Sequence, residues 1–115
     1  MILLHINNKE KLEKVTKLSE TLGHKVRTFG NDEYDMMLVQ LVKGEKPTGK
    51  PKLPPLYVMP DVIIFSGLTD EELDDFLDAY RKEGIPETRL KAMITPFNLM
   101  VRLSQLLDEW RLEGL

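Results

Sequence analysis

The residues best suited to hold a polar ligand lie directly after the predicted strands. Asparagines follow the apolar run Ile2–Ile6, a Ser-Gly pair follows 62–65, and a Thr-Pro-Phe-Asn turn closes 91–95. In an open α/β sheet, ligands bind beyond the carboxyl ends of the strands. The residues predicted to line such a site are Asn7, Asn8, Ser66, Gly67, Thr95, Phe97 and Asn98. The alternative is structural, because Asn and Thr also cap helices and Gly makes turns.

Side chains that could catalyse a reaction are scarce. His5 and His24 are the only histidines, and the chain has no cysteine. His5 sits in an apolar run, which favours a core residue with its ring nitrogens satisfied. No serine stands in a G-x-S-x-G turn, and the glycines are spread singly, so no phosphate-binding loop is predicted. The sequence therefore favours a protein that is not an enzyme and needs no cofactor.

Acidic residues crowd the segment 70–78. Metal sites need carboxylates that converge on one point, whereas these are predicted to lie on the solvent face of a helix. No metal site is therefore predicted. An acidic helix face can instead contact a basic partner, and the residues assigned to this contact are Asp74, Asp75 and Asp78.

The charge distribution narrows the partner classes. Residues 1–60 carry ten Lys or Arg and seven Asp or Glu, whereas residues 61–115 carry six and twelve, giving the net charge of -3. The lysines are scattered, which argues against nucleic-acid binding. No apolar run approaches the ~20 residues of a membrane span. Without cysteine or a signal peptide, we expect a cytoplasmic protein. Surfaces of opposite charge can pair between copies, so we expect a monomer or a weak homodimer.

Strand-like and helix-like segments alternate along the chain. Apolar runs predict strands near 2–6, 26–29, 62–65 and 91–95, and amphipathic stripes predict helices after each of them. This order, β-α-β-α-β-α-β-α, predicts a single α/β domain over residues 1–115 with a four-stranded, mostly parallel sheet and helices on both faces. We expect the strand order 2-1-3-4, with a ligand crevice between strands one and three. The proline-rich segment 45–60 is predicted to be an extended connection.

Helix boundaries follow from capping residues. Asn7 or Asn8 is expected to cap the first helix, and Thr69 with Glu72 forms a predicted capping box before the third. The second helix is expected to begin at Asn31 or Asp32, and the fourth at Thr95-Pro96. Gly23, Gly44, Gly84 and Gly114 are the predicted helix ends.

Two segments of the second half carry a family resemblance. The stretches I-I-F-S-G-L-T-D-E-E-L-D-D-F-L (63–77) and L-K-A-M-I-T-P-F-N (90–98) are similar to the bacterial family catalogued as domain of unknown function 3783. The resemblance covers mainly residues 56–113. It implies an α/β fold and no particular activity.

Together these observations favour a non-catalytic protein-interaction or regulatory module. The alternative is a binder of a small polar or anionic ligand at the carboxyl ends of the strands.

Overall fold

The computed structural model describes residues 1–113, and the side chains of residues 1–110. It confirms the α/β class and the alternation of strands and helices. The elements are β1 (Ile2–His5), α1 (Lys9–Thr21), β2 (Val26–Thr28), a 3-10 turn (Asn31–Glu33), α2 (Leu38–Lys43), β3 (Val62–Phe65), α3 (Asp70–Lys82), β4 (Leu90–Met93) and α4 (Leu103–Glu113).

The four strands form one sheet in the predicted order, β2-β1-β3-β4. The outer pairs, β1 with β2 and β3 with β4, are parallel as expected. The central pair is antiparallel, with Ile2 opposite Phe65 and His5 opposite Val62. The sheet is therefore mixed and mostly parallel. The carboxyl ends of β1 and β3 lie at opposite edges of the sheet, where an edge means a side at which the strands begin or end.

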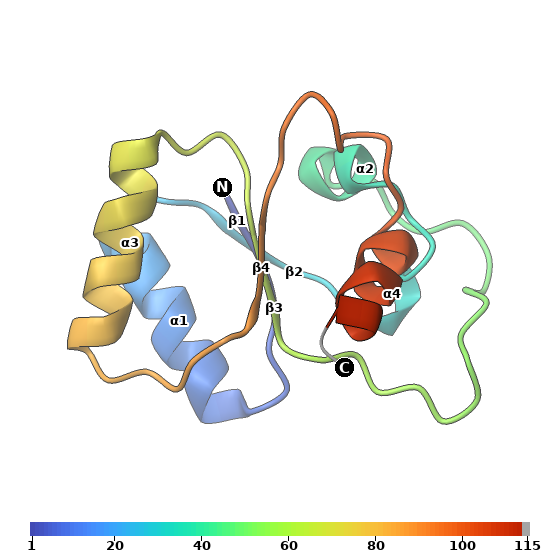
Figure 1. The fold of residues 1–115 in the computed structure, drawn as a ribbon, viewed down its shortest axis with the longest axis horizontal. Coiled ribbons are helices and arrows are strands. Elements are labelled where there is room, and N and C mark those ends of the chain that lie inside the picture. Colours follow the sequence, from blue (N-terminus) through green and yellow to red (C-terminus); the bar gives the residue numbers. More distant parts are fainter. Residues whose placement is uncertain (114–115) are drawn as a thin grey trace.

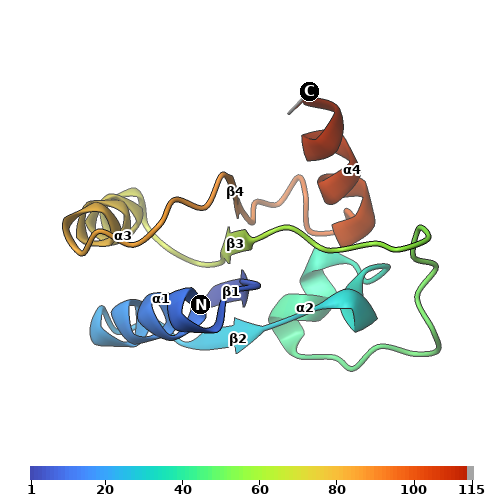
Figure 2. The ribbon, with the colours of Figure 1, turned by 90° about the horizontal axis from the view of Figure 1, so that it is seen from below.

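Helices cover both faces of the sheet. Figure 1 shows α1 and α3 together on one side of the strands and α2 and α4 on the other. Figure 2 shows α1 and α3 running side by side. Each face buries its own set of apolar side chains, because every strand presents alternate residues to opposite faces.

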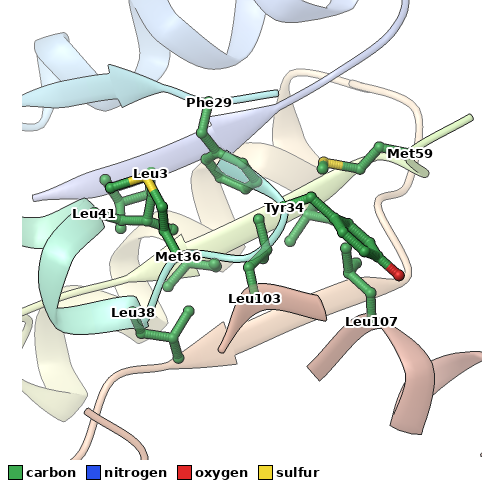
Figure 3. Packing of buried hydrophobic residues seen from close by; sticks show 11 residues of the cluster. Leu3, Phe29, Tyr34, Met36, Leu38, Leu41, Met59, Leu103 and Leu107 are labelled. Atoms are coloured by element: carbon green, nitrogen blue, oxygen red, sulfur yellow. The ribbon is translucent and has the colours of Figure 1, made fainter. Parts of the chain in front are cut away.

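Two hydrophobic clusters result from this alternation. Leu3, Val62 and Ile64 pack against α2 and α4, whereas Ile2, Leu4 and Ile63 pack against α1 and α3. The first cluster also holds Phe29, Tyr34 and Met59, which come from segments outside the strands and helices. In Figure 3 these side chains fill the space between the sheet and α4.

The second and fourth helices begin later than predicted. α2 starts at Leu38 and α4 at Leu103, so the starts expected at residues 31–32 and 95–96 are wrong. The backbones before the two helices instead pair with each other at an isolated bridge between Met37 and Arg102. Met37 is extended at this bridge, the residues before it and before Arg102 form turns, and each helix begins at the residue after the bridge.

The segment 45–60 contains no helix or strand. Its far end is nevertheless anchored, because Met59 is only 1% exposed and the Tyr57 ring lies 5.0 Å from that of Tyr34. Gly23, Gly44 and Gly84 have positive φ at the predicted helix ends. Gly114 lies outside the described residues.

Candidate functional site

The residues predicted to line one crevice lie at two opposite edges of the sheet. Asn7 and Asn8 follow β1, whereas Ser66 and Gly67 follow β3 and lie beside Met1 at the other end of the ladder. Thr95, Phe97 and Asn98 follow β4, which is parallel to β3 and ends at the same edge as it. The expected convergence is therefore wrong, because it assumed parallel central strands.

At the edge where β1 ends, the asparagines bind the chain itself. The Asn7 side-chain amide donates to the Met59 carbonyl at 2.9 Å, and its backbone amide donates to Asp61 Oδ1 at 2.8 Å. Asn8 Oδ1 accepts from the Lys11 backbone amide at 2.9 Å, so Asn8 is the cap of α1. Asn8 therefore caps the helix, as the structural alternative has it, whereas Asn7 does not cap α1 and instead binds the segment before β3.

At the opposite edge, the Thr95–Asn98 turn is also closed internally. Asn98 Oδ1 accepts from the Thr95 backbone amide at 2.8 Å, and its amide group donates to the Met93 carbonyl at 2.9 Å. This turn is not a helix N-terminus, since α4 starts at Leu103. Phe97 is 95% exposed, and Met100 beyond it is also exposed.

The acidic residues of α3 face solvent. Asp74, Asp75 and Asp78 are all exposed, and Asp78 pairs with Arg81 one turn further along the helix. Thr69 and Glu72 form the predicted capping box at the start of this helix. No other charged element covers this face in the described part of the chain, so its role as a partner contact stays a prediction.

The structure shows a groove that the sequence did not indicate. A cavity of about 570 Å³ opens beside the starts of β3 and β4. Its walls are Tyr57, Val58, Leu90, Leu107 and Trp110, and its charged rim is Asp61, Glu87, Arg89 and Asp108. We call this cavity the Trp110 groove. It lies at the edge of the sheet that holds Asn7, opposite Phe97.

The connection between α3 and β4 forms one side of the groove. The Tyr80 hydroxyl donates to the Pro86 carbonyl and lies 3.1 Å from Thr88 Oγ1, which is fully buried. Lys91 Nζ donates to the Thr88 carbonyl at 2.8 Å and to Glu87 Oε1 at 3.0 Å. These contacts give the connection a fixed shape without a helix or strand.

Sequence reasoning missed the groove because Trp110 fitted the apolar stripe of the last helix. Trp110 does pack partly against the core, yet its remaining surface lines the groove. Two signals were available. Trp110 is the only tryptophan of the chain, and residues 87–89 interrupt the passage from α3 to β4 with polar side chains.

A partly buried ion pair lies beside the groove. Lys11 Nζ lies 2.9 Å from Asp61 Oδ2 and donates to the Glu87 carbonyl at 3.1 Å. Partial burial by itself raises the pKa of Asp61. The hydrogen bonds from Asn7 and Lys11 outweigh that effect and hold the pKa below its ordinary value of 3.8. Asp61 therefore stays ionised and ties α1 to the start of β3.

The described residues do not assemble a recognisable catalytic centre. His5 Nδ1 lies 2.9 Å from the Phe29 carbonyl, and Nε2 lies 3.3 Å from Asn7 Oδ1, so both ring nitrogens have partners. Within residues 1–113, no group of three or more His, Asp or Glu side chains is arranged to hold a metal ion. None of the helices in the described part of the chain has the length and hydrophobicity of a transmembrane span.

These features define a small α/β protein with a mixed four-stranded sheet and an open, partly aromatic groove at one sheet edge. Residues 61–114 match the model of the family described as a domain of unknown function, DUF3783. The match confirms the resemblance seen in the second half of the chain. No curated protein and no solved structure matches the chain.

Proposed function

We propose that this protein is a non-catalytic interaction module that binds an apolar segment of a partner protein in the Trp110 groove. The observation that carries this proposal is the composition of the groove. Trp110 and Tyr57 stand beside aliphatic walls, and Arg89 lies on the rim. Tryptophan, tyrosine and arginine are the residues that most often dominate the energy of protein–protein interfaces.

The charge of the second half of the chain favours a basic partner segment. At the rim itself the charges balance, because Lys11 pairs with Asp61 and Lys91 with Glu87, and Asp108 stands beside Arg89 in the lining. The second half of the chain nevertheless carries twice as many acids as bases, so its field attracts cations. We therefore propose a partner with an apolar side chain flanked by lysine or arginine.

The acidic face of α3 contributes to this preference from a distance. α3 lies on the opposite face of the sheet from α4, so Asp74, Asp75 and Asp78 do not line the groove (Figure 1). Exposed charges of one sign increase the rate at which an oppositely charged partner arrives. We propose this steering role for the three aspartates. The proposed setting is the cytoplasm, in keeping with the absence of cysteine.

The single tryptophan makes the groove directly measurable. Trp110 is the only tryptophan, so the tryptophan emission of the protein reports on this groove alone. The protein is titrated with synthetic peptides that carry Leu or Phe between lysines, and with matched peptides that carry glutamates instead. We expect the lysine peptides to shift the Trp110 emission saturably and the glutamate peptides to leave it unchanged.

Two exposed residues at opposite edges provide matched variants. Val58 lines the groove and is 75% exposed, whereas Phe97 is 95% exposed at the far edge. Val58→Arg adds bulk and positive charge to the groove, and it should weaken peptide binding at least about tenfold, or ~1.4 kcal/mol. Phe97→Arg should leave the affinity unchanged. Equal affinity in wild type and Val58→Arg, or an equal loss in both variants, contradicts the proposed site.

A further inference from the structure

The two halves of the chain share one backbone plan. We call residues 1–44 the first half and residues 61–113 the second half. Each half runs strand, helix, strand, helix, and the corresponding helices cover the same face of the sheet (Figures 1 and 2). The strand order is symmetric too, with β1 and β3 in the centre and β2 and β4 outside.

The correspondence extends to single hydrogen bonds at the first helix of each half. Asn8 caps α1 and Thr69 caps α3, each by accepting from the backbone amide three residues later. Gly23 and Gly84 then follow the helices with positive φ, 88° and 67°. Each glycine donates to a carbonyl three residues earlier, at 3.0 Å in both cases.

The approach to the second helix repeats in the same way. Leu38 donates to the Val101 carbonyl at 2.9 Å, and Leu103 donates to the Met36 carbonyl at 2.8 Å. A glutamine side chain closes the first turn of each helix, with Gln40 accepting from Met37 and Gln105 accepting from Arg102. The same irregular entry, which no periodicity predicts, is therefore built twice.

These contacts are reciprocal about a two-fold axis. In the central ladder Leu3 faces Ile64, its own equivalent, while Ile2 faces Phe65 and Leu4 faces Ile63. Met37 likewise faces Arg102, its own equivalent. An interface in which position i meets j and position j meets i is the isologous interface of a two-fold dimer.

A doubly wound topology would account for the order of strands and helices, but not for the repeated caps or for a bridge between two equivalent residues. We infer that the first half is a second, diverged copy of the unit that the second half represents. The surface between β1 and β3 is then a dimer interface within one chain, and its natural partner is another copy of the same unit. The family match to residues 61–114 alone is what a single-copy family produces.

One pair of charged residues would repel each other if a copy of the second half took the place of the first. Lys11 of the first half binds Asp61, but the residue equivalent to Lys11 in the second half is Glu72, which follows its cap Thr69 by the same interval. In a pair made of two second halves, Glu72 of one copy would therefore face Asp61 of the other. Glu72→Lys restores the ion pair, and this makes the inference testable.

The decisive variant replaces residues 1–44 with a start methionine and a second copy of residues 62–109, and keeps the connection 45–60. Two versions are made, one with Glu72→Lys in the added copy and one without. We expect the Glu72→Lys version to be a monomer in light scattering with one cooperative unfolding transition. It should melt at least about 5 °C above the unmodified version, as a change near 1 kcal/mol does in a domain of this size. Equal melting of the two versions, or a dimer, overturns the inference.

Failure of both chimeras to fold is resolved by a second measurement on full-length chains. Val15 and Phe76 are equivalent, and both are fully buried in the same cluster. Val15→Asp disables the first half and Phe76→Asp the second, so each variant alone should be unfolded in circular dichroism. Refolded together, they should form a 1:1 dimer in which the intact halves pair. Recovery of less than about a tenth of the native signal on mixing rejects pairing between chains.

Discussion

The two halves of the molecule differ where the chain leaves the shared frame. The passage from α3 to β4 is longer than that from α1 to β2, and α4 has 11 residues where α2 has 6. Both additions meet at the Trp110 groove, since residues 87–89 line one side and Trp110 stands on the added turns of α4. The frame is common to both halves, and the candidate site consists largely of what only one half possesses.

The turns before α2 and α4 likewise share their backbone and differ in an exposed side chain. Gly30 donates to Glu33 Oε2 and Thr95 donates to Asn98 Oδ1, both at 2.8 Å, so the two turns have the same closing bond. The third residue of the turn is exposed in both halves, and it is Asp32 in the first half and Phe97 in the second. The same backbone turn thus presents a carboxylate in the first half of the chain and an aromatic ring in the second.

The strongest test of the comparison is the loss of an equivalent leucine from each half. Leu38 and Leu103 are fully buried in the same cluster and begin α2 and α4 (Figure 3). Leu38→Ala and Leu103→Ala should each lower the free energy of unfolding by about 3 kcal/mol, through lost burial and the cavity left behind. Urea unfolding followed by circular dichroism measures both. Leu56→Ala, at a fully exposed residue, is the control. A difference above ~2 kcal/mol between the two leucine variants breaks the equivalence.

A smaller effect is expected where the halves differ, at the ion pair. Asp61→Ala removes the carboxylate that pairs with the Lys11 ammonium, and the Lys11 side chain is only 8% exposed. The free energy of unfolding at neutral pH should fall by about 2 kcal/mol. Lys14→Ala, which breaks the exposed pair with Glu10, should change it by less than ~0.5 kcal/mol. Equal effects of the two substitutions would mean that the Asp61 pair behaves as a surface pair.

The same ion pair predicts a pH dependence. The pKa of Asp61 is lower in the folded than in the unfolded protein, so the unfolded chain binds more protons as the pH falls. The stabilisation by Asp61 is therefore complete above its ordinary pKa of 3.8 and is lost below it, as the pH approaches the folded value. In Asp61→Asn, the free energy of unfolding should therefore fall less as the pH is lowered. Urea unfolding curves recorded between about pH 2 and 6 measure this difference. An unchanged pH profile would contradict the assignment.

The smallest effect concerns the matched caps. Asn8→Ala and Thr69→Ala each remove a side-chain acceptor at a helix start, which costs about 1 kcal/mol. Amide hydrogen exchange should show faster exchange in the first turn of the affected helix only. Fraying that spreads to the other helix in either variant would mean that α1 and α3 do not behave as separate copies of one unit.

Local signals in the sequence predicted much of the fold. The apolar run at 62–65 and the capping box at Thr69 are short-range features, and both are present as expected. The strand order 2-1-3-4 was also predicted correctly. The direction of β3 relative to β1 was not, because a long proline-rich connection can return the chain in either direction. The predicted crevice depended on that direction and was lost with it.

The late starts of α2 and α4 show a second limit. The spacing of Tyr34, Met37, Leu38 and Leu41 satisfies a helical stripe. The α-helix nevertheless begins only at Leu38, after the short 3-10 turn at Asn31–Glu33. The pairing of Met37 with Arg102 fixes where the α-helix begins. A contact between residues so distant in sequence leaves no periodic signal. The Trp110 groove was not predicted for a related reason, because its walls come from the connection 45–60, β4 and α4 together.

The two-fold axis between β1 and β3 also bears on how this sequence can change. In a dimer of identical chains every substitution appears twice, once on each side of the axis, and must be tolerated in both places. Fusion of the two copies removes that constraint. Lys11 and Glu72 carry opposite charges at equivalent positions, a difference that no pair of identical chains can hold. One copy is thus free to keep the shared frame while the other acquires a new surface.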